Sequence, residues 1–373
     1  MPTSGGLEGI IAGNSAISLV EGEIGRLTYR GITIEDLAEH SSFEEVCHLL
    51  WEGELPTRAQ LDDLRSRLRD HRALAATAER VLEILPKDAS PMAVLRTVAS
   101  TLGAADPEAG DNSPDALRGH ASRLTAQMPT CIAAFHRRRE GLPAIPPRED
   151  LGHAANFLYM LTAEEPGRAA ARAFDVALIL HADHGFNAST FAARVTIATL
   201  SDIYSAVTSG IGTLSGPLHG GANERVARML DEIGDPANVE PYIKGKLAQH
   251  ERIMGFGHRV YKTADPRARI LRDMAEKLTT ERGAHEYMDM SLRIEQLMLD
   301  EKGINSNVDF YSATVYRMLG IPVDLFTPIF AASRVCGWTA HVMEQLADNR
   351  LIRPRANYNG RKDVAYVPIE QRS

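Results

Sequence analysis

The fold class follows from residues 59–85, which read AQLDDLRSRLRDHRALAATAERVLEIL. Leu, Ala and Val recur there at spacings of three and four between Arg and Asp, the pattern of an amphipathic helix. The same periodicity returns over 151–162, 168–182, 189–214, 224–233, 265–280, 286–300 and 328–347. The alternation of strands with helices that is typical of a parallel sheet is missing. We therefore predict a mainly α fold.

Only the amino-terminal part of the sequence suggests strands. Residues 16–20 and 26–29 flank a turn-like segment, 21–25, and predict a small β-hairpin. Further along, breaks at 215–223 and 303–308 enclose a segment rich in charged helices. At 373 residues the chain is long enough for two domains, so this segment could be a smaller domain inserted into a larger one.

Composition and charge exclude several classes of protein. The net charge of -8 gives no reason to expect a nucleic acid or an anionic membrane as partner. Cys47, Cys131 and Cys336 form no metal-type cluster, and their odd number fits a reducing compartment. The start lacks the features of a signal peptide, and the longest apolar run is interrupted by Arg194 and Asp202. We expect a soluble cytoplasmic protein.

Four short segments stand out: HADHGFN (181–187), GPLHGGAN (216–223), GFGHRVYK (255–262) and NSNVDF (305–310), and three of them place His or Asp beside Gly, Pro or Asn. Each has a purely structural reading. His181 and His184, one helical turn apart, could be a core pair or a metal pair. His219 could mark a helix start, and Asp309 could be the N-cap of a helix over 310–319.

Two arginines favour a functional reading. Arg267 falls in the first turn of a helix that starts at Asp265, where a cation opposes the helix dipole, so an anion is expected nearby. Arg334 has Phe330 and Trp338 as helical neighbours and no acidic residue within a turn. An arginine on an apolar face needs a partner, and we predict a bound carboxylate.

Together these residues fit one kind of chemistry. A carboxylate can remove a proton next to a carbonyl, while a neutral histidine donates a hydrogen bond to the enolate oxygen that develops. Guanidinium groups hold the carboxylates of an anionic substrate in a fixed orientation.

GPLHGGAN, GFGHRVYK followed by DPR, and NVDF, in this order and spacing, resemble the citrate synthase family. GRLTYRGITIEDLAE (25–39) and NRLIRPRA (349–356) extend the resemblance over essentially the whole chain. It implies that Asp309 deprotonates the acetyl methyl group and that His219 donates to the enolate oxygen. His258 would polarise the ketone of oxaloacetate and protonate the new alkoxide.

The resemblance also implies how substrates bind. His184, Arg267 and Arg334 would hold oxaloacetate, and Arg353 would reach the site of the partner subunit. Coenzyme A would be bound by Arg252, Ile253, Met254, Gly255, Phe256, Gly257 and Lys262. Acetyl-CoA is then a substrate, and no metal or permanently bound cofactor is expected. The implied assembly is a homodimer, with a large domain over 1–219 and 326–373 and a small domain over 220–325.

Three alternatives stay open. A 2-methylcitrate synthase would use propionyl-CoA by the same mechanism, and a methylene is worth only about 1–3 kcal/mol of discrimination. A metal-dependent hydrolase could use His181, His184 and a carboxylate, although HxxH is not the HExxH signature. A catalytically silent helical scaffold would leave the polar residues unexplained.

Overall fold

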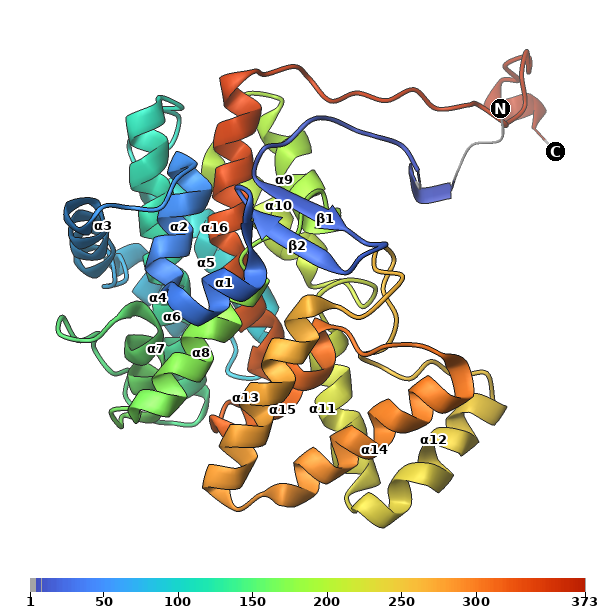
Figure 1. Cartoon of the computed structure of the whole chain (residues 1–373). Helices are drawn as coiled ribbons and strands as arrows, with labels where there is room; N and C mark the ends of the chain where they lie inside the picture. The colour runs from blue at the N-terminus through green and yellow to red at the C-terminus, as the bar shows by residue number, and fades with distance from the viewer. Residues whose placement is uncertain (1–4, 8, 373) are drawn as a thin grey trace.

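The computed structural model describes residues 5–7 and 9–372 and is mainly helical, as the sequence predicts (Figure 1). The first half contributes α1 Ile34–His40, α2 Phe43–Glu52, α3 Arg58–Asp70, α4 Ala76–Ile84, α5 Pro91–Ala105, α6 Pro114–Arg139, α7 His153–Thr162, α8 Arg168–His181, α9 Ala188–Ile197 and α10 Ile203–Leu214. The second half contributes α11 Ala222–Ile233, α12 Val239–Ala248, α13 Pro266–Arg282, α14 His285–Lys302, α15 Val308–Met318 and α16 Phe326–Ala347.

The predicted hairpin is confirmed. Strands β1 Ser18–Glu21 and β2 Arg26–Tyr29 pair antiparallel, with Ser18 opposite Tyr29 and Glu21 opposite Arg26. A third strand, β3 Ile32–Thr33, pairs with β2 and was not predicted. Two residues are too few to carry an alternating pattern.

Two segments predicted as single helices are each two helices. Residues 59–85 divide into α3 and α4, and the buried Arg72 between them donates to the Arg148 carbonyl oxygen over 2.5 Å. Residues 189–214 divide into α9 and α10. Asp202 caps α10, its side chain accepting a 2.7 Å hydrogen bond from the Ser205 N–H, and Leu200 before it has a φ of 64°.

Helix α16 forms the centre of the core. Trp338 is fully buried on it, and α2, α6, α8, α9 and α10 pack around it. Figure 1 shows α16 in red between the blue-green helices on one side and α9 and α10 on the other. The core is therefore built around the same helix that carries Arg334.

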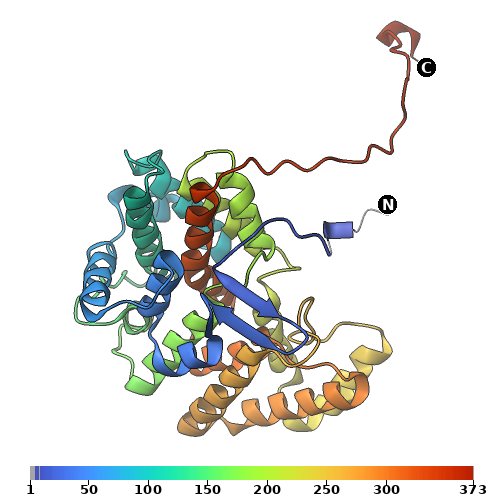
Figure 2. The ribbon, with the colours of Figure 1, turned by 45° about the horizontal axis from the view of Figure 1, so that its top comes forward.

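Helices α11 to α15 lie together at the bottom of Figure 1, below the body that surrounds α16. This is the segment that the sequence suggests as a second domain. After α16 the chain runs away from the body as an extended tail, which both Figure 1 and Figure 2 show. Most side chains of the tail are exposed, including Leu351, Tyr358 and Tyr366.

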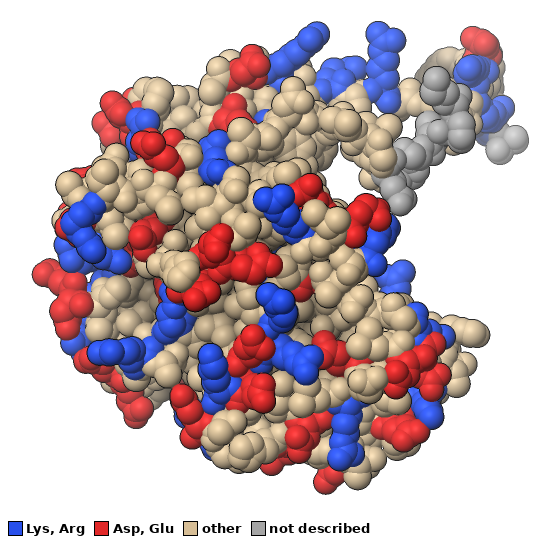
Figure 3. All heavy atoms as spheres, viewed as in Figure 1, with Lys and Arg blue, Asp and Glu red and all other residues tan. Residues whose placement is uncertain are grey.

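Acidic and basic side chains are intermixed over the face that Figure 3 shows. Among the residues that the structure describes, no helix combines the length and apolar character needed to cross a bilayer.

Candidate active site

The segment HADHGFN begins at the end of α8 and continues into the loop before α9. His181 is the last residue of α8, so His184 lies outside the helix, and the prediction of two histidines one helical turn apart is wrong. The neighbouring Asp183 is fully buried and anchors the loop. Its carboxylate accepts a 2.5 Å hydrogen bond from Ser18 Oγ and lies 3.2 Å from His341 Nε2.

His258 lies opposite His184, in the loop between α12 and α13. The two rings are 5.1 Å apart in an edge-to-face arrangement, and Tyr261 completes the group through a 3.2 Å contact between its hydroxyl and His184 Nε2. His258 Nδ1 accepts hydrogen bonds from the backbone N–H groups of Val260, at 3.0 Å, and Tyr261, at 3.2 Å. A nitrogen that accepts carries no proton, so His258 presents an Nε2–H donor.

His219 lies in the turn between α10 and α11, and its tautomer is the opposite one. Its Nε2 accepts a 3.3 Å hydrogen bond from the Ser189 backbone N–H, and Ser189 Oγ lies 2.8 Å from the same nitrogen. Trp338 Nε1 donates to that hydroxyl over 3.2 Å and holds it in place. The free donor of His219 is therefore Nδ1–H.

All three histidines are held neutral. Burial, with Arg334 adding to it, lowers the pKa of His219 to about 4. Burial and the Arg267 charge lower the pKa of His258 to about 4. The pKa of His184 falls well below its usual value for the same reasons, burial first and then Arg267. At neutral pH each ring offers a neutral N–H rather than a positive charge.

Asp309 is the second residue of α15 and not its N-cap. Asn307 has that role, since its side chain accepts a 3.0 Å hydrogen bond from the Asp309 N–H, and the N-cap reading of Asp309 is wrong. Burial raises the pKa of the Asp309 carboxyl to about 7, although the charges of Arg267 and Arg334 act in the opposite direction. A carboxylate whose pKa lies near neutrality is suited to act as a general base.

Arg267 is buried and already has an anion. The carboxylate of Asp265 accepts from its Nε at 3.0 Å and from its Nη2 at 2.8 Å. Burial works against the charged guanidinium, but the Asp265 pair more than offsets it and raises the pKa of Arg267. The anion expected from the first-turn position is thus Asp265 itself, and only Nη1 of Arg267 lies outside this pair.

Arg334 differs from Arg267 in having no such pair. It is 1% exposed, donates from Nε to the His181 carbonyl oxygen over 2.6 Å, and lies over the Phe330 ring at 4.7 Å. Among the described residues no carboxylate forms a salt bridge with it, and burial lowers its pKa. This is the buried, weakly paired cation that the sequence predicts.

The segment 252–257 lies against the amino-terminal end of α15. Gly257 N–H donates to the Asn305 carbonyl over 3.0 Å, and Asn307 N–H donates to the Gly255 carbonyl over 2.9 Å. Ile253 and Gly255 are buried, Met254, Phe256 and Gly257 are half-buried, and Arg252 is exposed. Lys262 is exposed in the His258 loop, whereas Arg353 is exposed in the carboxy-terminal tail.

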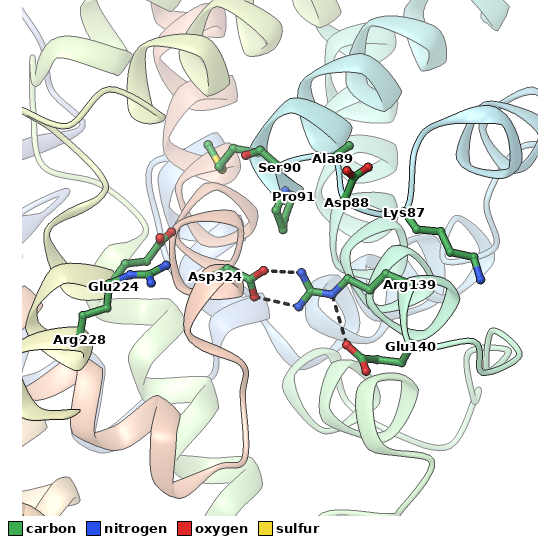
Figure 4. Close-up of a pocket in the computed structure, with 11 residues that line it drawn as sticks. Lys87, Asp88, Ala89, Ser90, Pro91, Arg139, Glu140, Glu224, Arg228 and Asp324 are labelled. Atoms are coloured by element: carbon green, nitrogen blue, oxygen red, sulfur yellow. Dashed lines mark hydrogen bonds and ion pairs between the residues drawn. The ribbon is translucent and has the colours of Figure 1, made fainter. Parts of the chain in front are cut away.

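The part of the chain that the structure describes offers no ligand set for the metal site of the alternative hypothesis. No group of three or more His, Cys, Asp or Glu side chains there could hold a metal ion. His181 Nδ1 lies 2.7 Å from the Ala177 carbonyl oxygen, while His184 Nε2 faces Tyr261. The polar pocket in Figure 4 also lies elsewhere, and none of the predicted site residues line it; Arg139 pairs there with Asp324.

Three residues of the site were not predicted from the sequence. Tyr261 lies within the quoted GFGHRVYK segment, where an aromatic three residues after a candidate histidine was the available signal. Asp265 was read only as a helix cap. Ser189, which fixes the tautomer of His219, lies 30 residues before it, and no local pattern joins the two.

Comparison with known proteins gives the family of this chain. The family described as "Citrate synthase, C-terminal domain" matches residues 6–355. "Citrate synthase 2" of Bacillus subtilis (strain 168) is 51% identical, with all of both chains covered. A "2-methylcitrate synthase" of Mycobacterium tuberculosis is 47% identical over 95% of this chain and 90% of its own. A solved ternary complex of citrate synthase from the archaeon Thermoplasma acidophilum with carboxymethyl coenzyme A and oxaloacetate is 34% identical, with a TM-score of 0.93 over 98% of each chain. On these matches, this chain belongs to the citrate synthase family.

Proposed function

We propose that this protein is a citrate synthase, which condenses acetyl-CoA with oxaloacetate and hydrolyses the citryl thioester to citrate and coenzyme A. The observation that carries the proposal is a set of two neutral histidines, with free protons on opposite ring nitrogens, and a carboxylate whose pKa is about 7, each acted on by the charge of Arg267, Arg334 or both. Full-length identity to "Citrate synthase 2" supports the same activity.

In the proposed reaction Asp309 removes a proton from the acetyl methyl group. The Nδ1–H of His219 donates to the thioester oxygen as the enolate forms. The enolate carbon then attacks the ketone carbon of oxaloacetate, which the Nε2–H of His258 polarises and afterwards protonates. Water cleaves the thioester, so that the carboxylate of citrate and the thiol of coenzyme A are released.

Oxaloacetate carries two carboxylates, and the site offers two guanidinium groups. Arg334 has no competing salt bridge among the described residues, and Arg267 has Nη1 outside its pair with Asp265. His184 joins them because its ring lies 5.1 Å from His258. Under the proposed domain division, Arg334 belongs to the large domain and Arg267 to the small one, so oxaloacetate would draw the two together and close the cleft.

Coenzyme A is proposed to bind along 252–257, with Lys262 near its phosphates. This segment is hydrogen-bonded to the residues just before Asp309, so a thioester held there would present its acyl group to the base. Asp309 and His258 carry the proton transfers of the condensation, water supplies those of the hydrolysis, and coenzyme A takes part as a substrate.

We further propose that the active unit is a homodimer in which Arg353 serves the partner's site. Arg353 is exposed and belongs to the tail after α16, which Figure 2 shows leaving the body. Mixing inactive Asp309→Asn chains with inactive Arg353→Ala chains should therefore restore activity, because one site of the heterodimer receives neither change. Failure of the mixture, with subunit exchange verified by mass spectrometry, would place Arg353 outside the partner's site.

The decisive experiment measures release of free thiol from acetyl-CoA and, separately, from propionyl-CoA, with oxaloacetate present or omitted. We expect a higher kcat/KM with acetyl-CoA, a strict requirement for oxaloacetate, and no effect of a metal chelator. A higher kcat/KM with propionyl-CoA would identify a 2-methylcitrate synthase instead, the activity named for the relative that is 47% identical.

A further inference from the structure

The turn of the amino-terminal hairpin lies directly against the loop that carries His258. The Lys262 N–H donates to the Gly22 carbonyl over 3.0 Å, between the β1–β2 turn and the His258 loop. Figures 1 and 2 both show the tip of the hairpin beside this loop, which comes about 240 residues later in the chain. No role in the proposed reaction requires the hairpin to be there.

The contact is too close for any side chain at position 22. A Cβ added to Gly22 would lie 2.0 Å from the Val260 carbonyl oxygen and 2.6 Å from its carbonyl carbon, so the backbone would have to shift. Gly25, at the other end of the turn, has a φ of 64°, and a Cβ there would lie 2.7 Å from the Ala264 carbonyl oxygen. The turn thus fits the His258 loop only because both positions are glycine.

The backbone that Gly22 touches is the backbone that orients His258. The Val260 carbonyl and the Tyr261 N–H belong to one planar peptide unit, and that N–H donates to His258 Nδ1 over 3.2 Å. The Val260 N–H, in the preceding peptide unit, donates to the same nitrogen over 3.0 Å. Pushing the Val260 carbonyl outward therefore rotates the Tyr261 N–H away from the ring.

We propose that the β1–β2 turn is a buttress for the His258 loop and that Gly22 is a positioning residue for His258. By holding the Val260–Tyr261 peptide in place, it keeps Nδ1 as the acceptor and the proton on Nε2. The same loop directs the Tyr261 hydroxyl to His184, so the buttress also sets the spacing of the two histidines. The catalytic consequence rests on the proposed function, whereas the effect on the tautomer does not.

The test compares Gly22→Ala with two matched controls. Gly110→Ala adds the same methyl group where no atom lies within 4 Å, and Glu23→Ala changes an exposed side chain within the same turn. Nitrogen-15 spectra of ring-labelled histidine at pH 8 report the tautomer of His258, with its signals assigned from a His258→Gln variant. Turnover is measured on the same samples with oxaloacetate and acetyl-CoA.

For the wild type and both controls we expect a His258 protonated at Nε2 only. Gly22→Ala should mix the two tautomers and lower kcat by about 100-fold, the effect expected from a catalytic group misplaced by about 1 Å. A folded Gly22→Ala protein with wild-type spectra and kcat would overturn the proposal. So would a wild-type His258 protonated at Nδ1, which decides the matter even if Gly22→Ala does not fold. A wild type without synthase activity would refute the proposed function alone, since the spectra still test the buttress.

Discussion

Replacing Arg334 by leucine separates a substrate clamp from a structural cation. The structure gives Arg334 one hydrogen bond, to the His181 carbonyl, and one aromatic contact, with Phe330. Among the described residues it forms no salt bridge, and its side chain is almost completely buried. The free protein therefore bears the cost of a buried charge that a bound carboxylate would offset.

The two effects of Arg334→Leu have different sizes. On stability, loss of a donor to the His181 carbonyl costs about 1–3 kcal/mol, and removal of a buried charge that Asp183 offsets only in part, without a salt bridge, returns a similar amount. The net change in the free energy of unfolding should be small. On binding, loss of one buried charge pair with a substrate carboxylate costs about 2–5 kcal/mol. At about 1.4 kcal/mol for each factor of ten, oxaloacetate should bind roughly 30- to 4,000-fold more weakly.

The assay combines chemical denaturation with the oxaloacetate dependence of turnover. Arg194→Leu is the matched control, because Arg194 is also buried but pairs with Glu344 at 2.6 Å and contacts His341 Nδ1 at 3.1 Å. We expect Arg194→Leu to lower stability by roughly 1–3 kcal/mol with little change in the KM for oxaloacetate. If Arg334→Leu instead behaved like this control, Arg334 would be structural and the clamp argument would be refuted.

The remaining predictions concern the base, the donors and closure. Asp309→Asn should fold normally and lose roughly 10²–10⁴-fold in kcat, and near-wild-type turnover would remove Asp309 from the mechanism. The base must be ionised, its pKa is about 7 in the free protein, and bound oxaloacetate would raise that pKa further, so the wild-type kcat/KM for acetyl-CoA at saturating oxaloacetate should rise with pH through a value above 7. His219 and His258, with pKa values of about 4, are already neutral there and should add no further pH dependence of kcat/KM above pH 6. If the same pH dependence persisted in the residual activity of Asp309→Asn, it would belong to another group. His219→Ala should lower kcat severely, as a lost enolate donor costs about 10²–10³-fold. X-ray scattering should show a more compact particle with oxaloacetate, and identical curves would contradict closure.

The elements that the sequence predicts well are those with a long hydrophobic period. Helix α16 is an example, because its apolar residues repeat over five turns, and the prediction of 328–347 missed only its first two residues. The predictions failed at short interruptions such as the one before Asp202. A capping Asp is a weak local signal beside the surrounding periodicity, and the break depends on its hydrogen bond to the Ser205 N–H.

For the site, residue types could be predicted but their protonation could not. The motifs point to His219 and His258, which stand beside Gly, and to Asp309, which follows Asn307 by two residues. Which nitrogen of each histidine carries the proton depends on donors from other peptide units, the Ser189 N–H for one and the Tyr261 N–H for the other. Only the folded chain brings Ser189 to His219, so the opposite tautomers are a property of the structure alone.

The charges of the site also explain why oxaloacetate should precede acetyl-CoA. In the free protein, Arg267 and Arg334 both act to lower the pKa of Asp309, against the effect of burial. A bound dianion would neutralise part of this positive charge and thereby raise the pKa of Asp309, which makes the carboxylate a stronger base. The histidines would remain neutral, because burial is the largest cause of their low pKa values. Within the proposed mechanism, binding of the first substrate thus strengthens the base before the methyl group that it must deprotonate arrives.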